Sequence, residues 1–107
     1  MTTQKESILK QKIMRMLFNL PNSIWERIEQ KSIKGTPDII GCYKGRSFWL
    51  EVKNKIKKVK NYEKIQIIKL NKHTKAGGVS MILTQDNYKQ EIEGIKDDRC
   101  KSDTGNE

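Results

Sequence analysis

Apolar residues near the N-terminus recur at helical spacing. The positions three or four residues apart that share one face are Leu9, Ile13, Met16, Leu17 and Leu20. This spacing predicts an amphipathic helix that ends near Pro21. Glu6 falls on the same line, which points it toward the core side of that helix or to its edge. Glu6 also fits a capping box with Thr3 as the N-cap residue, and both interpretations stand at this point.

The pattern downstream switches between strand and helix. Alternation around Ile24 to Ile28 predicts a strand, and "DIIGCY" and "RSFWLEVK" predict a β-hairpin with its turn at "YKGR". Residues 62–76 predict a second helix that "GG" ends, "GVSMILT" a further strand, and "QDNYKQEIEGI" a last helix. We expect an α/β fold with a mixed β-sheet flanked by helices, in the order α-β-β-β-α-β-α. One domain should cover residues 1–96, and residues 97–107 form a polar tail that we expect to be disordered.

The hairpin brings charges together. If Lys44 and Gly45 are the turn residues, Asp38 lies directly opposite Glu51, and Lys53 shares their face. A turn shifted by one residue pairs Asp38 with Lys53 and keeps all three charges on that face. The rest of that face is Ile40, Cys42 and Trp49, and the opposite face holds Ile39, Tyr43, Phe48, Leu50 and Val52. Both faces are largely apolar, which predicts a sheet covered on two sides.

Two carboxylates this close repel each other, and burial makes the ionised pair costlier. Lys53 can supply one compensating charge, but a divalent cation fits better, because Mg²⁺ prefers carboxylate oxygens and retains waters that substrate phosphates replace. The competing interpretation places Asp38 and Glu51 at an exposed hairpin end, where Lys53 discourages edge pairing. Gly35 and Pro37 precede Asp38 and would fix its backbone, which favours the metal site.

The charge balance bears on the partner. Lys and Arg outnumber Asp and Glu by 22 to 13, for a formal net charge of +9, so a polyanion such as DNA is the expected partner. A merely soluble basic protein is the alternative. Two distant cysteines and one histidine favour neither a disulfide framework nor a zinc site. We see no secretory signal and no apolar run that would span a bilayer, so we expect a cytoplasmic protein without a membrane partner.

The "GTPDIIG" and "FWLEVKN" motifs together resemble the PD-(D/E)XK nuclease superfamily and, more narrowly, its VRR-NUC domain family. Some members of that family are free-standing and phage-encoded, and the resemblance covers all but the last dozen residues. It implies a restriction-endonuclease-like core and a Mg²⁺- or Mn²⁺-dependent DNA endonuclease that hydrolyses phosphodiester bonds. It further implies selectivity for branched DNA such as four-way (Holliday) junctions or flaps, a homodimer, and the host-cell cytoplasm if the protein is phage-encoded. The alternative is a non-catalytic, basic nucleic-acid-binding module with the same fold.

The resemblance also assigns roles to residues. Asp38 and Glu51 become metal ligands, joined by the backbone carbonyl of Val52, and Lys53 becomes the catalytic lysine that positions or activates the attacking water. Glu6 becomes the helix carboxylate near the metal, which favours the functional interpretation of that residue.

Gln66 matches the glutamine of the family. A helical wheel independently places Gln66 on the inner arc of the second helix, which also holds Tyr62, Ile65, Ile67, Leu70 and Ala76. A glutamine there needs a hydrogen-bond partner, and it also suits a purely structural role of satisfying a backbone group. His73 lies at the edge of the helix, and we interpret it as a surface or satisfied residue.

Several basic or aromatic residues are candidates for DNA contact. A lysine-rich loop follows "EVK", and Tyr62 is a possible stacking group, although a solvated basic loop fits the pattern equally well. The candidates are Arg27, Lys34, Lys55, Lys57, Lys58 and Tyr62.

Overall fold

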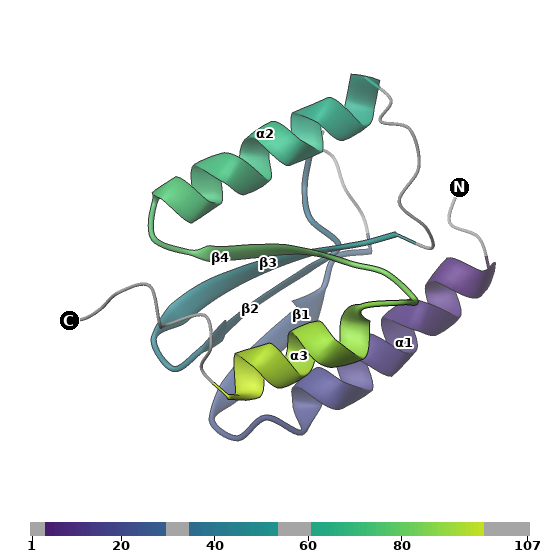
Figure 1. Ribbon diagram of the computed structural model, residues 1–107, viewed down its shortest axis with the longest axis vertical. Helices are drawn as coiled ribbons and strands as arrows, with labels where there is room; N and C mark the ends of the chain where they lie inside the picture. Colours follow the sequence, from purple (N-terminus) through teal and green to yellow (C-terminus); the bar gives the residue numbers. More distant parts are fainter. Residues whose placement is uncertain (1–3, 30–34, 54–60, 98–107) are drawn as a thin grey trace.

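The computed structural model describes residues 4–29, 35–53 and 61–97. Its elements are α1 (Gln4–Phe18), β1 (Ser23–Arg27), β2 (Ile39–Tyr43), β3 (Arg46–Val52), α2 (Asn61–Lys75), β4 (Val79–Leu83) and α3 (Tyr88–Lys96). The protein is therefore α/β, with a four-stranded mixed sheet flanked by helices in the order that the sequence predicts (Figure 1). Thr3 and residues 98–107 of the expected tail lie outside the described residues.

The spatial order of the strands follows the chain, β1-β2-β3-β4. The β1/β2 and β2/β3 pairs are antiparallel, whereas β3 and β4 are parallel. Parallel neighbours need a crossover connection, and α2 provides it. Because α2 returns the chain to the start of β4, it runs antiparallel to β3.

The β2–β3 hairpin has the predicted turn. Lys44 and Gly45 both adopt positive φ angles, of 53° and 79°, as a two-residue type I′ turn requires. The register then pairs Tyr43 with Arg46 and continues to Ile39 with Leu50. The predicted register of the hairpin is therefore confirmed, and continued by one step it sets Asp38 opposite Glu51.

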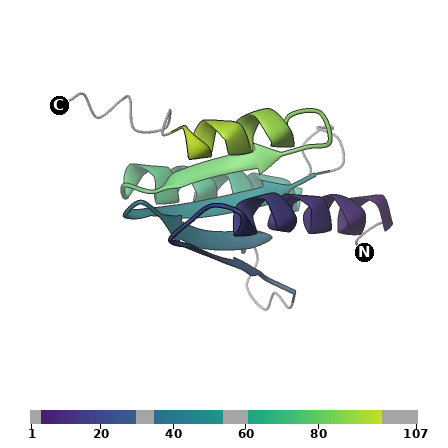
Figure 2. The same ribbon diagram turned by 90° about the horizontal axis from the view of Figure 1, so that it is seen from below.

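The core lies between the sheet and two helices. Helices α1 and α3 cover one face, and α2 lies on the other (Figure 1; Figure 2 gives the view from below, with α2 behind the sheet). The α1 side chains at helical spacing are buried as predicted, with Leu9, Ile13 and Leu17 at most 1% exposed. They meet the inward face of the strands, whose buried residues are Trp25, Ile39, Tyr43, Phe48, Leu50, Val52 and Leu83.

The prediction that both sheet faces are covered is wrong for the β1–β2 half. Cys42 is exposed, and Ile24 of β1 is 69% exposed. The physical reason is width: one helix is about 10 Å across, which spans two strands spaced about 4.8 Å apart. Helix α2 contacts β3 and β4 and leaves the outer face of β1 and β2 open to solvent.

The inward face of α2 is narrower than the helical wheel suggests. Leu70 is 7% exposed, the Oε1 atom of Gln66 is buried and His73 contacts the sheet, so the inward positions are four and three residues apart. Ile65 and Ile67, by contrast, are 37% and 36% exposed, and Ala76 is also exposed, so their predicted inward position is wrong. Strands β3 and β4 together present a narrow surface, so they contact only one line of residues along α2.

None of the helices in residues 4–29, 35–53 and 61–97 is both long and apolar enough to cross a membrane.

Candidate functional site

Asp38 and Glu51 are held at one end of the sheet by backbone hydrogen bonds. The amide of Ile28 donates to the carbonyl oxygen of Asp38 at 2.8 Å, which extends the β1/β2 ladder by one step. On the other side, the amide of Lys53 donates to the carbonyl oxygen of Leu83 at 2.9 Å and extends the β3/β4 ladder. The backbone under both carboxylates is therefore fixed before any ligand arrives.

The carboxylate of Asp38 is buried and bridges three elements. The residue is 4% exposed, and its Oδ2 atom accepts a hydrogen bond from the amide of Val52 at 2.8 Å. Its Oδ1 atom lies 3.4 Å from the ammonium nitrogen of Lys10 in α1. Asp38 thus ties the start of β2 to the end of β3 and to the first helix.

Glu51 is equally buried, at 3% exposure. Its Oε2 atom lies 3.3 Å from the Nζ atom of Lys53, two residues further along the chain. Continued one step beyond the printed strand pairs, the register sets Glu51 opposite Asp38, so both acids lie at the same end of the sheet. The interpretation of Asp38 and Glu51 as residues of an exposed hairpin end is therefore wrong, because both are buried.

Lys10 is the residue of this site that sequence reasoning missed. It is 8% exposed, which is unusual for a lysine, and it contacts Asp38 from the far side of the sheet relative to α2. A signal was present: Glu6, Lys10, Ile13 and Leu17 follow one another at spacings of four, three and four. A charged residue within an apolar helical line indicates a buried partner.

Glu6 lies in the first turn of α1 and is half-buried. Because Glu6 is four residues before Lys10, the two side chains lie on the same face of the helix, one turn apart. The ion pair between Lys10 and Asp38 brings this part of α1 to the same end of the sheet, but within the described residues Glu6 does not form a three-carboxylate group with Asp38 and Glu51.

Two observations place Gln66 beside the same end of the sheet. A Cβ atom added at Gly35 would lie 2.8 Å from Lys69 Cδ and 3.2 Å from Ile65 Cγ2, so the segment that leads to Asp38 passes directly against α2. The position along the strand agrees. His73 contacts Ser47 and Trp49, and Gln66 lies seven residues (about 10.5 Å) earlier in α2. Glu51 lies four residues (about 13 Å) beyond Ser47 and two residues (about 7 Å) beyond Trp49 in β3, so Gln66 and Glu51 are at a similar height.

The Oε1 atom of Gln66 is buried and accepts no hydrogen bond from the described part of the chain. A buried amide oxygen in this state is uncommon, and it is available to a water or to a ligand. The structural alternative, in which Gln66 satisfies a backbone group through this oxygen, has no support among these residues.

The donor set suits a hard divalent cation. Asp38 and Glu51 provide carboxylate oxygens and Val52 a carbonyl oxygen at the same strand end, and Mg²⁺ commonly binds through one or two carboxylates and fills its other positions with water and phosphate oxygens. Within residues 4–29, 35–53 and 61–97, no three His, Cys, Asp or Glu side chains gather as a metal cluster. Two carboxylates and a carbonyl are oxygen donors of the kind that Mg²⁺ and Mn²⁺ bind.

Most of the proposed DNA contacts cannot be placed. Lys34, Lys55, Lys57 and Lys58 lie outside the described residues, and Tyr62 lies in α2 with its side chain undescribed. Arg27 is described, and its Nε atom lies 2.8 Å from the Glu29 carboxylate. Glu29 is 67% exposed, so this ion pair is weak and does not test the expected contact of Arg27 with DNA.

His73 anchors α2 to the sheet. Its ring stacks on Trp49 with centroids 4.3 Å apart, and its Nδ1 and Nε2 atoms lie 2.8 Å and 2.9 Å from the hydroxyls of Ser80 and Ser47. The Ser80 hydroxyl donates to the carbonyl of Leu70, so it accepts from Nδ1–H and leaves Nε2 as the acceptor for Ser47. Desolvation by burial lowers the pKa of His73. The sequence predicts a surface or satisfied residue, and the structure shows a partly buried ring with a hydrogen bond at each nitrogen, so the satisfied histidine is confirmed.

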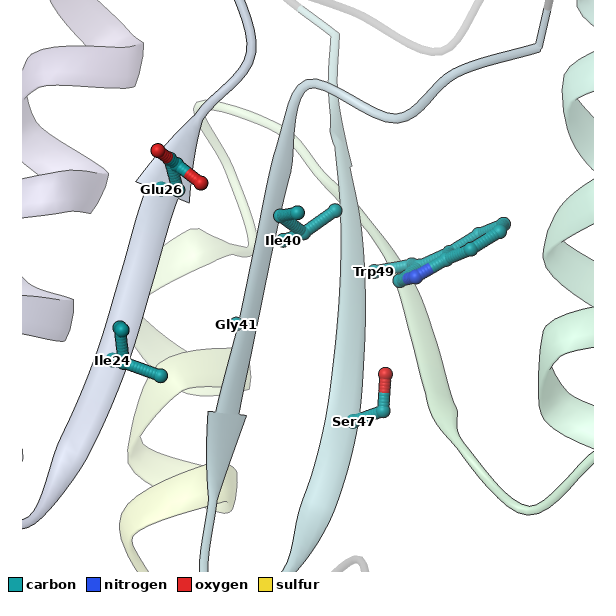
Figure 3. A pocket seen from close by; sticks show the side chains of 6 residues that line it. All are labelled: Ile24, Glu26, Ile40, Gly41, Ser47 and Trp49. Atoms are coloured by element: carbon teal, nitrogen blue, oxygen red, sulfur yellow. The ribbon is translucent and has the colours of Figure 1, made fainter.

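A pocket of about 260 Å³ lies on the open sheet face (Figure 3). It contains neither Asp38 nor Glu51. Its lining residues are Ile24, Glu26, Ile40, Gly41, Ser47 and Trp49. It is thus a separate feature from the carboxylate site.

Searches found no matching family model, no matching curated protein and no matching solved structure.

Proposed function

We propose that this protein is a Mg²⁺- or Mn²⁺-dependent DNA endonuclease with a restriction-endonuclease-like core. The observation that carries the proposal is the burial of Asp38 and Glu51 at opposed strand ends, with the ammonium of Lys53 3.3 Å from Glu51. Two carboxylates are costly to bury together, so a fold that fixes both on central strands has a use for their charge.

Each residue of the site has a distinct task. Asp38, Glu51 and the carbonyl of Val52 hold the metal ion. When bound, that ion polarises a phosphoryl oxygen and makes water a stronger nucleophile. Lys53 orients the attacking water and neutralises charge that develops on the phosphate. Gln66 offers its buried oxygen as a hydrogen-bond acceptor for that water, and Glu6 adds negative charge at the margin of the site.

The formal net charge of +9 supports a polyanionic substrate. Exposed lysines on α2, at Lys64, Lys72 and Lys75, present positive charge on the side of the sheet that Glu51 faces. The preference for four-way junctions or flaps, and a homodimer that cuts two strands, follow from the family resemblance alone.

Glu51→Gln tests the proposal. The matched control is Glu26→Gln, which makes the same change at an exposed residue of β1. We expect Glu51→Gln to abolish Mn²⁺-dependent cleavage of a labelled four-way junction while the gel-shift affinity for that junction stays the same or rises, and Glu26→Gln to cleave normally. Wild-type protein that binds the junction but never cleaves it would favour the non-catalytic binding module.

A further inference from the structure

Lys10 is the charged member of the site that the proposed chemistry does not use. Its ammonium lies 3.4 Å from Asp38 Oδ1, the oxygen that does not accept the Val52 hydrogen bond. Oδ2 accepts the Val52 amide, and Oδ1 faces the ammonium of Lys10. A metal ion that binds Asp38 through Oδ1 would therefore compete with Lys10 for that atom.

The summed charge of the site also favours displacement of Lys10 by a metal ion. Asp38 and Glu51 carry two negative charges, and Lys10 and Lys53 carry two positive charges, so the four described side chains sum to zero. A divalent ion added to these four side chains brings two more positive charges close to the ammonium groups of Lys10 and Lys53, and departure of Lys10 removes one of them. The release of one ammonium therefore favours metal binding.

We propose that Lys10 is an exchangeable counter-ion, which neutralises Asp38 in the metal-free protein and is displaced when a divalent cation binds. The inference rests on the proposed metal-dependent function. Glu6 lies one helical turn away on the same face of α1, at a spacing at which acidic and basic side chains interact. Lys10 thus sets the affinity of the site for the metal.

The test is calorimetric titration of Mn²⁺ into the full chain, without DNA. Lys10→Met keeps the length and apolar stem of the side chain and removes the competing charge, and we expect Mn²⁺ to bind about tenfold more tightly, a change worth about 1.4 kcal/mol. Lys12→Met removes one positive charge from an exposed position of the same helix and controls for the general loss of charge, so its Kd should stay within about twofold of the wild type.

Lys10→Arg provides a second variant that retains the charge. A guanidinium binds a carboxylate with two donors, so we expect this variant to hold Asp38 more firmly and to bind Mn²⁺ more weakly than the wild type. This result would support the exchange even if Lys10→Met failed to fold.

The outcomes separate the two claims. Mn²⁺ affinity that Lys10→Met leaves unchanged or weakens, or that Lys12→Met raises equally, would overturn the role of Lys10 and leave the metal site intact. The absence of Mn²⁺ binding in the wild type and in every variant would overturn the proposed function together with the inference.

Discussion

The ion pair between Lys10 and Asp38 predicts strong energetic coupling between two residues that are 28 positions apart in the chain. Asp38→Asn preserves the shape of the side chain and an oxygen that accepts from the Val52 amide, but leaves the buried ammonium of Lys10 without this carboxylate. Lys10→Met removes the other charge. Breaking one side of a buried pair commonly costs about 3–5 kcal/mol, whereas removing both charges costs much less.

The magnitude follows from the distance and the exposure. At 3.4 Å, Coulomb attraction amounts to about 5 kcal/mol at an effective dielectric constant of about 20 and about 1 kcal/mol in bulk water. The two side chains are 10% and 6% exposed, which places the pair closer to the first limit. We therefore expect a coupling free energy of about 2–4 kcal/mol, a large part of the 5–15 kcal/mol that stabilises a typical domain.

The assay is a double-mutant cycle in urea, followed by circular dichroism, with EDTA present so that metal ions play no part. Each single variant should lose about 3 kcal/mol of unfolding free energy, and Asp38→Asn combined with Lys10→Met should lose far less than the sum. Lys12→Met serves as the control for Lys10→Met and should change stability by less than about 0.5 kcal/mol. Additive losses, within about 0.5 kcal/mol, would refute a buried ion pair.

Three further predictions concern other parts of the molecule. Gly41→Ala should lower the unfolding free energy by about 1–3 kcal/mol, because its methyl group would collide with the ring of Trp25 and the carbonyl oxygen of Ile24. The control, Cys42→Ala at the exposed neighbouring residue, should have little effect on stability. Equal losses of stability in the two variants would contradict the packing around Gly41. Because the pKa of His73 is lowered in the folded protein, the unfolded chain binds a proton at this imidazole more readily, and stability should fall as the pH drops below about 6.5. In urea-unfolding experiments at several pH values, His73→Gln should reduce this loss of stability at low pH. Parallel pH profiles for the variant and the wild type would count against the neutral, doubly hydrogen-bonded ring. Affinity for duplex DNA, measured by fluorescence anisotropy, should fall as the salt concentration rises. A plot of the logarithm of the association constant against the logarithm of the salt concentration should have a slope of about −0.9 per neutralised phosphate. An affinity that does not depend on salt would contradict a phosphate-binding surface.

The sequence predicted the parts of the fold that follow from local rules. The turn residues Lys44 and Gly45 fixed the hairpin register, and that register alone placed Asp38 opposite Glu51. Helical spacing located the buried line of α1, and the "GG" after α2 marked its end within two residues. These features depend on φ angles and periodicity, which neighbouring residues determine.

The missed features depend on how elements meet in space. Helical spacing marks Lys10 as a charge within an apolar line but does not identify its partner, since Asp38 is brought to it only when α1 packs across the sheet. The exposure of Ile65 and Cys42 depends on how much of the sheet α2 covers, which periodicity does not reveal. The ion pair of Arg27 with Glu29 arises from side-chain geometry just beyond β1, and it is equally invisible in a residue pattern.

Cleavage of DNA tests the central claim most directly. A labelled four-way junction, a flap and a linear duplex would each be incubated with the wild type and with Asp38→Ala, in Mg²⁺, Mn²⁺ or EDTA. The account predicts that wild-type protein cuts at least one branched substrate with either metal, that EDTA stops the reaction, and that Asp38→Ala is inactive. Intact DNA under every condition, or equal cutting by Asp38→Ala, would contradict it.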